Sequence, residues 1–306
     1  MDIGRVHRAW KRFIWAPLRS RLYPEVETQI GNKRMRFDLR DQIISRTLYV
    51  YGAYEPEMQR LMSKMNLPGA VCLDIGANIG LHTIAMSELV GDTGRVFAFE
   101  PEEHNYRLLE HNLQINNITN VVLSQSAVSD TEGVCQIGLN PVNYGDHRVS
   151  TASPGEWATR EVAMTTVDAS LCELPDGSIR FIKIDVQGHE LHVLRGMENT
   201  LKRNPDAIMM IEIAPDLLSN AGTSATEVMS YLYDLGFTGW ELEAHRIVPL
   251  SEAWVYDLIR DKMWVDAVVS RNSELLRNAM SDFCGVTLPP VPSREKGLHT
   301  GLTKGN

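Results

Sequence analysis

Short apolar segments alternate with longer amphipathic segments over most of the chain beyond residue 70. A continuous apolar run bounded by polar and turn residues is typical of a strand that is buried on both faces of a sheet. Strands that alternate with helices predict an α/β fold with a doubly wound, mostly parallel sheet and helices on both faces. Seven strands are expected, at residues 70–75, 95–100, 120–126, 179–185, 207–213, 237–243 and 263–270.

The ends of the predicted helices carry recognisable signals. After the first strand, apolar side chains share one helical face from Leu81 onward, and Gly91 is expected to end that helix. Further along, Ser224 and Glu227 have the spacing of a capping box, in which each side chain bonds the backbone amide of the other residue. These signals indicate helices of ordinary length between the strands.

Residues 131–178 interrupt the alternation. Two strand-like segments, at 132–140 and 160–168, lie on either side of a stretch rich in turn residues. An insertion at this point of an α/β sheet usually lies above the carboxyl ends of the strands, where ligands bind. We therefore expect a β-rich lid over the active site that contacts the substrate, and His147 within it is a candidate contact.

The regions outside the sheet domain, which we assign to residues 46–288, have a different composition. Residues 1–45 are expected to form a basic helix and a hairpin, and residues 289–306 are expected to be disordered because they are polar and rich in Pro and Gly. The basic helix either packs on the domain or makes a peripheral contact with an anionic membrane. It has no continuous apolar core of the kind that a secretory signal contains.

The overall charge narrows the choice of partner. The chain carries a formal net charge of −9, which repels the phosphate backbone of nucleic acids, so nucleic acid is not an expected partner. Its four cysteines show no paired spacing, as is usual in a reducing compartment. No apolar run approaches the roughly 18–20 residues of a membrane-spanning helix. These features favour a cytoplasmic protein.

The most informative segment is the tight turn after the first strand. This strand ends near Asp74, and the chain turns through Gly76, Asn78 and Gly80 into a helix. Glycine permits a positive φ and close approach of a ligand, and asparagine tolerates the left-handed region better than other side chains. A strand, a tight turn and a helix in this order are typical of a nucleoside-binding unit.

The next strand supplies a second element of such a site. It ends in Glu100, whose carboxylate can accept hydrogen bonds from both hydroxyls of a ribose. A dinucleotide-binding site would need the pattern G-x-G-x-x-G, which the turn lacks, and Asp74 would repel a pyrophosphate. The same acid would attract the cationic sulfonium of S-adenosylmethionine (SAM). The residues favour SAM, with a nicotinamide-dependent oxidoreductase as the alternative.

Several longer motifs occur in a characteristic order. They are DIGANIGLHT (74–83), FEP (99–101), SQSAVSD (124–130) and KIDVQGHELHVLRG (183–196). Together they resemble the FkbM family of methyltransferases, and the resemblance extends over roughly residues 45–245. It implies a Rossmann-like, class I fold and SAM-dependent methylation of a hydroxyl on a sugar, glycolipid or secondary-metabolite acceptor.

The resemblance also implies roles for single residues. Glu100 would hold the ribose, Ser126 and Ala127 would border the adenine, and Glu55 would close over the cofactor. The methionine part of SAM would be held by Asp74, Gly76, Asn78 and Gly80. The family usually has Glu where this chain has Gln187, so one negative charge is missing near the site.

Methyl transfer to a hydroxyl also needs a group that removes the proton, and a positioned base typically adds about 10²–10⁴-fold in rate. Asp185 ends the fourth strand, Glu212 lies near the end of the fifth, and His189 and Glu190 come just after Asp185. Two carboxylates on adjacent strand ends could instead bind Mg²⁺. Alternatively, Glu190 only caps a helix, and Glu212 pairs with a buried cation.

A third interpretation is a non-catalytic binding protein that keeps the fold. The presence of both Asp74 and Glu100 argues against it, because a protein that had lost the reaction would be free to lose either acid.

Overall fold

The computed structural model describes residues 15–149, 157–243, 246–250, 252–261 and 264–284. In this part of the chain the central sheet has eight strands in the order β13-β12-β14-β11-β10-β3-β4-β5. Their bounds are β3 Val71–Ile75, β4 Arg95–Phe99, β5 Val121–Ser124, β10 Ile179–Ile184, β11 Ile208–Ile213, β12 Thr238–Glu243, β13 Arg246–Pro249 and β14 Val265–Ser270. All seven predicted strands are present, and β13 is an additional edge strand.

The direction of the strands also follows the prediction of a mostly parallel sheet. The strands from β5 to β11 run parallel, and β14 is antiparallel to both of its neighbours. The chain reverses its direction of travel across the sheet between β3 and β10, because β4 and β5 are added on one side of β3 and β10 on the other. The carboxyl ends of strands at such a reversal leave a crevice for ligands.

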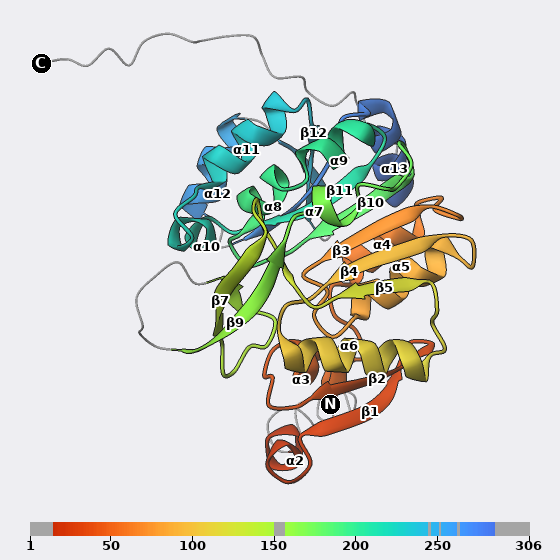
Figure 1. Ribbon diagram of the computed structural model, residues 1–306, viewed down its shortest axis with the longest axis vertical. Coiled ribbons are helices and arrows are strands. Elements are labelled where there is room, and N and C mark those ends of the chain that lie inside the picture. The colour runs from red at the N-terminus through yellow and green to blue at the C-terminus, as the bar shows by residue number, and fades with distance from the viewer. Residues whose placement is uncertain (1–14, 150–156, 244–245, 251, 262–263, 285–306) are drawn as a thin grey trace, which may run out of the picture.

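Helices cover both faces of this sheet (Figure 1). One face packs on α4 Pro56–Ser63, α5 Leu81–Val90 and α13 Ser273–Cys284, and the other on α8 Glu190–Arg195, α9 Glu198–Arg203, α11 Ala225–Asp234 and α12 Glu252–Asp261. Successive side chains of a strand enter opposite cores: Met209 and Ile211 face one, Ile208 and Met210 the other. Strands buried on both faces explain the continuous apolar runs in the sequence.

The predicted helix ends are present, although the capping box forms only one of its two backbone bonds, since Glu227 accepts from the Ser224 hydroxyl instead of its amide. Ser224 accepts a hydrogen bond from the backbone amide of Glu227 and begins α11. Gly91 ends α5 in a positive-φ conformation.

The N-terminal region packs beside another helix of the sheet domain, α6 Glu103–Ile115. It consists of α2 Ala16–Leu22, the antiparallel hairpin of β1 Glu25–Ile30 and β2 Lys33–Asp38, and α3 Ile44–Tyr51. The predicted hairpin is therefore present, and α3 follows it. Most of the predicted basic helix lies outside the described residues, as does the tail at 289–306. In the described part of the chain, no helix has the length and apolar character needed to cross a membrane.

The insertion forms a separate small sheet. Its strands are β6 Ala127–Val128, β7 Gly133–Leu139, β8 Arg148–Val149 and β9 Ala158–Thr165, in the order β6-β9-β7-β8. Figure 1 shows β7 and β9 projecting away from the central sheet. The two strand-like segments predicted here correspond to β7 and β9. The second ends earlier than expected, because Thr166 caps the short helix α7 Val167–Ser170.

Candidate active site

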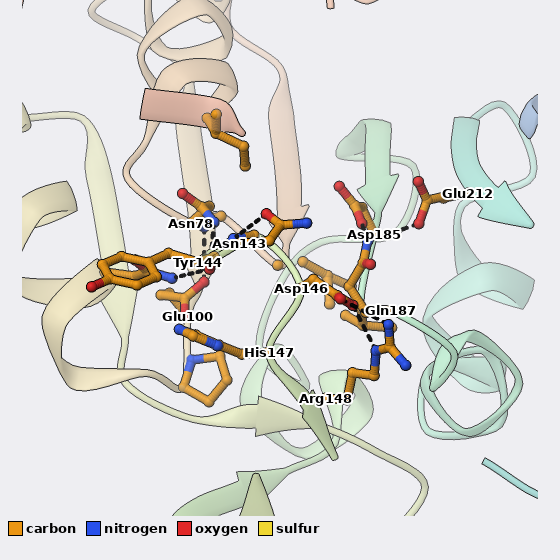
Figure 2. Close-up of a pocket in the computed structure, with 18 of the residues that line it drawn as sticks. Asn78, Glu100, Asn143, Tyr144, Asp146, His147, Arg148, Asp185, Gln187 and Glu212 are labelled. Carbon is orange, nitrogen blue, oxygen red and sulfur yellow. Dashed lines mark hydrogen bonds and ion pairs between the residues drawn. The ribbon is translucent and has the colours of Figure 1, made fainter. Parts of the chain in front are cut away.

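A cavity of about 510 Å³ opens at the carboxyl ends of β3, β4, β10 and β11. Residues 143–149 of the insertion line it from one side, and residues of the N-terminal region line it from another. In Figure 2, Asn78 and Glu100 lie on one side of this cavity, and Asp185, Gln187 and Glu212 lie on the other. The cavity joins the predicted cofactor and catalytic segments in one site.

The turn after β3 has the predicted conformation. Gly76 has φ +83° and Asn78 has φ +51°, so both are in the left-handed region. A Cβ atom on Gly76 would lie 1.9 Å from the backbone oxygen of Asp185. Glycine is therefore required for two reasons, its positive φ and the close passage of the chain that follows β10.

Glu100 stands at the floor of the cavity, as predicted for a ribose-binding acid. Its carboxylate accepts hydrogen bonds from the backbone amides of Asn78 at 2.8 Å and Glu102 at 2.9 Å. Only 5% of the residue is exposed, and burial raises its pKa to about 7. Each oxygen keeps a second lone pair for a further donor. Ser126 and Ala127 line the cavity as well.

Asp74 and Gly80 differ from the prediction, because neither lines the cavity. Asp74 is fully buried below the turn, where it accepts a hydrogen bond of 2.5 Å from Thr83 Oγ1. Gly80 begins α5, and a Cβ atom there would lie 2.4 Å from Leu109 Cδ1. In this structure both residues shape and support the turn.

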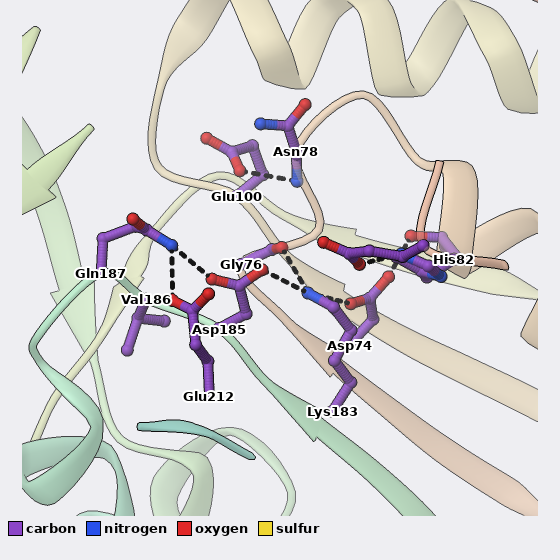
Figure 3. A network of polar contacts seen from close by, with 12 residues as sticks. Asp74, Gly76, Asn78, His82, Glu100, Lys183, Asp185, Val186, Gln187 and Glu212 are labelled. Atoms are coloured by element: carbon purple, nitrogen blue, oxygen red, sulfur yellow. Dashed lines mark hydrogen bonds and ion pairs between the residues drawn. The ribbon is translucent and has the colours of Figure 1, made fainter. Parts of the chain in front are cut away.

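Lys183 is a site residue that the sequence analysis missed. Its buried ammonium lies 3.3 Å from Asp185, 3.7 Å from Asp74 and 3.2 Å from the backbone oxygen of Gly76. The neighbouring carboxylates raise the pKa of Lys183 despite its burial, so it stays charged. Figure 3 shows the ammonium at the centre of this network. A lysine inside an otherwise apolar strand was the signal that could have identified it.

The two predicted catalytic carboxylates face each other across Gln187. The Gln187 side-chain amide donates one hydrogen bond to Asp185 at 2.7 Å and another to Glu212 at 2.8 Å (Figure 3). Gln187 itself has a left-handed backbone, with φ +55°. Burial, and then the charge of Asp185, raise the pKa of Glu212 well above its usual value. The pair therefore retains a proton at a higher pH than isolated carboxylates would.

This arrangement does not fit a resident Mg²⁺ ion. A divalent cation between the two acids would need oxygen ligands, whereas the amide of Gln187 directs hydrogen atoms at both of them. Among the described residues, no group of three His, Cys, Asp or Glu side chains converges as metal ligands would.

Glu55 lines the cavity, as expected of a residue that covers the cofactor. It has φ +46° at the start of α4, and its carboxylate lies 2.8 Å from Nε2 of His82. Contact with His82 lowers the pKa of Glu55 in spite of the burial. His82 also lines the cavity and was not predicted.

Two other predicted catalytic residues, His189 and Glu190, do not line the cavity. Glu190 accepts hydrogen bonds from the backbone amides of Val186 at 3.3 Å and Gly188 at 3.0 Å, so the alternative role as a helix cap describes its position. His189 lies 2.9 Å from Ser129 Oγ on the far side of the turn. Burial lowers the pKa of His189 to about 4, and it stays neutral.

The insertion lies above the site, as predicted for a lid. The backbone oxygen of Tyr144 accepts hydrogen bonds from the side-chain amides of Asn105 at 2.8 Å and Asn78 at 3.3 Å. His147 lines the cavity, and its Nδ1 accepts a hydrogen bond of 3.0 Å from the backbone of Asn140. Burial lowers the pKa of His147. The insertion is thus tied directly to the turn after β3.

Comparisons with known proteins agree with the family resemblance found in the sequence. The model of the methyltransferase FkbM domain matches residues 74–238. The hexuronic acid methyltransferase AglP of Haloferax volcanii is 30% identical over 190 residues, which are 60% of this chain and 75% of the relative. The methyltransferase sdnD of Sordaria araneosa is 30% identical over 166 residues, which are 44% of this chain and 62% of the relative.

Among solved structures, a putative methyltransferase from Streptococcus mutans in complex with SAH has 13% sequence identity and a TM-score of 0.42. The alignment covers 71% of this chain and 98% of that one. The family match decides against the nicotinamide-dependent alternative. With more than half of its length matched by the family model, the chain belongs to the FkbM family of SAM-dependent methyltransferases.

Proposed function

We propose that the protein transfers the methyl group of SAM to a hydroxyl of a sugar, glycolipid or secondary-metabolite acceptor. The observation that carries this proposal is that the Asp185–Gln187–Glu212 group lines the same cavity as Glu100. One side of the cavity thus offers acceptors for a ribose, and the other offers a carboxylate pair for a proton. The curated relative from Haloferax volcanii is described as a hexuronic acid methyltransferase, which also favours a sugar acceptor.

The cofactor would be held along the strand ends on the β3, β4 and β5 side. Glu100 would accept hydrogen bonds from the ribose, and Ser126 and Ala127 would border the adenine. The backbone of Gly76 and Asn78 would follow the methionine part, with Glu55 covering it. SAM would supply an electrophilic methyl group on a sulfonium, and the acids around the cavity suit this positive charge.

The carboxylate pair would take the proton of the acceptor. The hydroxyl oxygen forms the bond to the methyl carbon as the carbon–sulfur bond breaks, and the hydroxyl proton passes to the pair. Burial and the charge of Asp185 raise the pKa of Glu212, so its ionised carboxylate is a stronger base than an ordinary glutamate. Asp185, which is bonded to Lys183 and Gln187, would fix the geometry.

The test is methylation of a metabolite extract with SAM that carries a deuterated methyl group, followed by mass spectrometry. We expect labelled products whose fragments place the methyl group on oxygen, with or without EDTA. Glu212→Gln and Asp185→Asn should lower the rate at least about 100-fold while SAM binding, measured by calorimetry, persists. Glu103→Gln changes an exposed carboxylate and serves as the control.

Label found only on nitrogen or carbon would contradict the proposal. An enzyme that binds SAM but labels nothing would favour the non-catalytic interpretation. A full loss of activity in EDTA that Mg²⁺ restores would contradict the metal-free arrangement of the two acids.

A further inference from the structure

Trp264 is a large aromatic residue that the proposed reaction has not yet used. It lines the cavity and is 52% exposed, although Val265 beside it is only 4% exposed. An aromatic ring exposed inside a cavity is typical of a ligand-binding surface rather than of a core.

The sheet order places Trp264 away from the nucleoside end. It precedes β14, whose Val265 is paired with Ile213 of β11, and Ala214 beyond that pair also lines the cavity. Glu100 follows β4, on the other side of β3 and β10. Four strand spacings of ~4.8 Å separate β14 from β4, or roughly 19 Å. The Trp264 end is therefore the end that an acceptor would enter.

The groups around Trp264 are hydrogen-bond acceptors. Asp185 and Glu212 lie on the adjacent strand ends, and Asp216 lines the cavity from α10 Pro215–Asn220. Leu217, from the same helix, adds apolar surface. This end of the cavity thus combines a flat apolar face with several carboxylate oxygens. A sugar ring has the matching surface, with C–H groups on one face and hydroxyl donors around its edge.

The positive groups that line the cavity, in the described part of the chain, already have partners. Lys183 is bonded to Asp185, and Arg148 makes two contacts with Asp146, at 2.6 and 2.7 Å. A carboxylate on the acceptor would enter beside three acids, whereas Lys183 and Arg148 already bond acids of their own. The charge pattern therefore favours an uncharged acceptor over an acidic one.

We infer that the Trp264 end binds an uncharged sugar ring, stacked on the indole, with one hydroxyl directed at Asp185 and Glu212. Hexuronic acids are excluded by the surrounding carboxylates. The inference rests on the proposed function and adds the class of acceptor to it.

The experiment compares matched pairs of p-nitrophenyl glycosides as acceptors: glucose with glucuronic acid, galactose with galacturonic acid, and mannose with mannuronic acid. Within at least one pair, the uncharged member should be methylated at least tenfold faster. Trp264→Ala should raise KM for that sugar roughly tenfold or more, with the Kd for SAM unchanged. Trp264→Phe should recover most of this loss, and Ile259→Ala, an exposed apolar residue on α12, is the matched control.

Preference for the hexuronic acids would overturn the inference, as would a KM that Trp264→Ala leaves unchanged. Methylation of no glycoside in any pair by an enzyme that binds SAM would overturn it too. In each case, products from the extract that carry the deuterated methyl group on oxygen would leave the proposed function standing. If no product in either experiment carries that methyl group on oxygen, both the inference and the proposed function are contradicted.

Discussion

The Glu100 carboxylate is fixed by two backbone amides before any ligand binds. A hydrogen-bond acceptor that is already oriented loses little freedom on binding, so it contributes strongly to affinity. We expect Glu100→Ala to weaken SAM binding about 10- to 100-fold, the range for losing charged hydrogen bonds. Isothermal titration calorimetry measures this loss. Glu103→Ala removes an exposed acid from the next helix and should have no effect; normal binding by Glu100→Ala would disprove the ribose assignment.

Gln187 separates two acids with a neutral amide, so a third acid at this position should change their titration. Glu212 already faces Asp185, Glu190, Asp266 and Glu55, all of which raise its pKa. A negative charge from Gln187→Glu would raise it further, since the charged form becomes less favourable. The acidic limb of the pH–kcat profile should therefore move to higher pH by about one unit.

Two variants make the result of Gln187→Glu interpretable. Asp185→Asn removes a repelling charge and should move the same limb to lower pH in its residual activity. Gln136→Glu adds a charge to an exposed position of β7 and should leave the profile unchanged. If the acidic limb of the pH–kcat profile does not move in Gln187→Glu, the carboxylate pair does not control the rate.

At the residue scale, the sequence predicted conformation better than orientation. The left-handed backbone of Asn78 could be foreseen, because asparagine occupied a position in a glycine-containing turn. The left-handed backbone of Gln187 could not be foreseen, since nothing in a glutamine side chain favours that conformation. Asp74 was recognised as important, but its pairing with Lys183 depends on which side of the strand end each residue faces.

At the scale of elements, the contact between the turn after β3 and the end of β10 is the tightest in the site. Gly76→Ala would place its Cβ 1.9 Å from the backbone oxygen of Asp185. We expect a loss of about 3 kcal/mol or more in the free energy of unfolding, from the backbone strain and the forced movement together. Urea denaturation measures it.

Gly52→Ala, at the end of α3, is the matched control for Gly76→Ala. Its backbone is also left-handed, with φ +71° and ψ 13°, but no atom lies within 4 Å of the added Cβ. It should cost only about 1–2 kcal/mol, the strain of a left-handed backbone. Equal losses in the two variants would mean that crowding at Asp185 is unimportant.

The elements themselves were largely predictable, because strands buried on both faces leave continuous apolar runs. Strand β13 was not foreseen, since an edge strand of four residues after a turn has too few positions to show a pattern. The turn after β10 shows the other limit of prediction. Asp185, His189 and Glu190 are close in sequence, yet only Asp185 lines the cavity, because the chain turns sharply at Gln187 and Gly188.

At the scale of the whole molecule, the lid links the N-terminal region to the cofactor turn. The backbone amide of Gln42 donates to the oxygen of Val142 at 2.8 Å, and that of Tyr144 lies 3.4 Å from Asp41 Oδ1. The oxygen of Tyr144 is in turn held by Asn105. These contacts join segments about 100 residues apart in the sequence, and no local pattern predicts such pairings.

Because these contacts surround the cavity, SAM should stabilise all of them together. Hydrogen exchange followed by mass spectrometry should show slower exchange on SAM addition in residues 41–45 and 140–147, as well as in the turn at 76–80. The peptide that covers α9, far from the cavity lining, should exchange at an unchanged rate. Protection confined to the turn would show that the lid and the N-terminal region do not respond to the cofactor.

The buried Lys183 network has a consequence for what happens after the reaction. Its single ammonium lies among Asp74, Asp185, Glu55 and Glu100, so it offsets only part of their negative potential. A sulfonium compensates that potential, whereas the thioether left behind carries no such charge. Turnover therefore removes the attraction that brought the cofactor in, and the spent molecule should dissociate more readily than the fresh one bound.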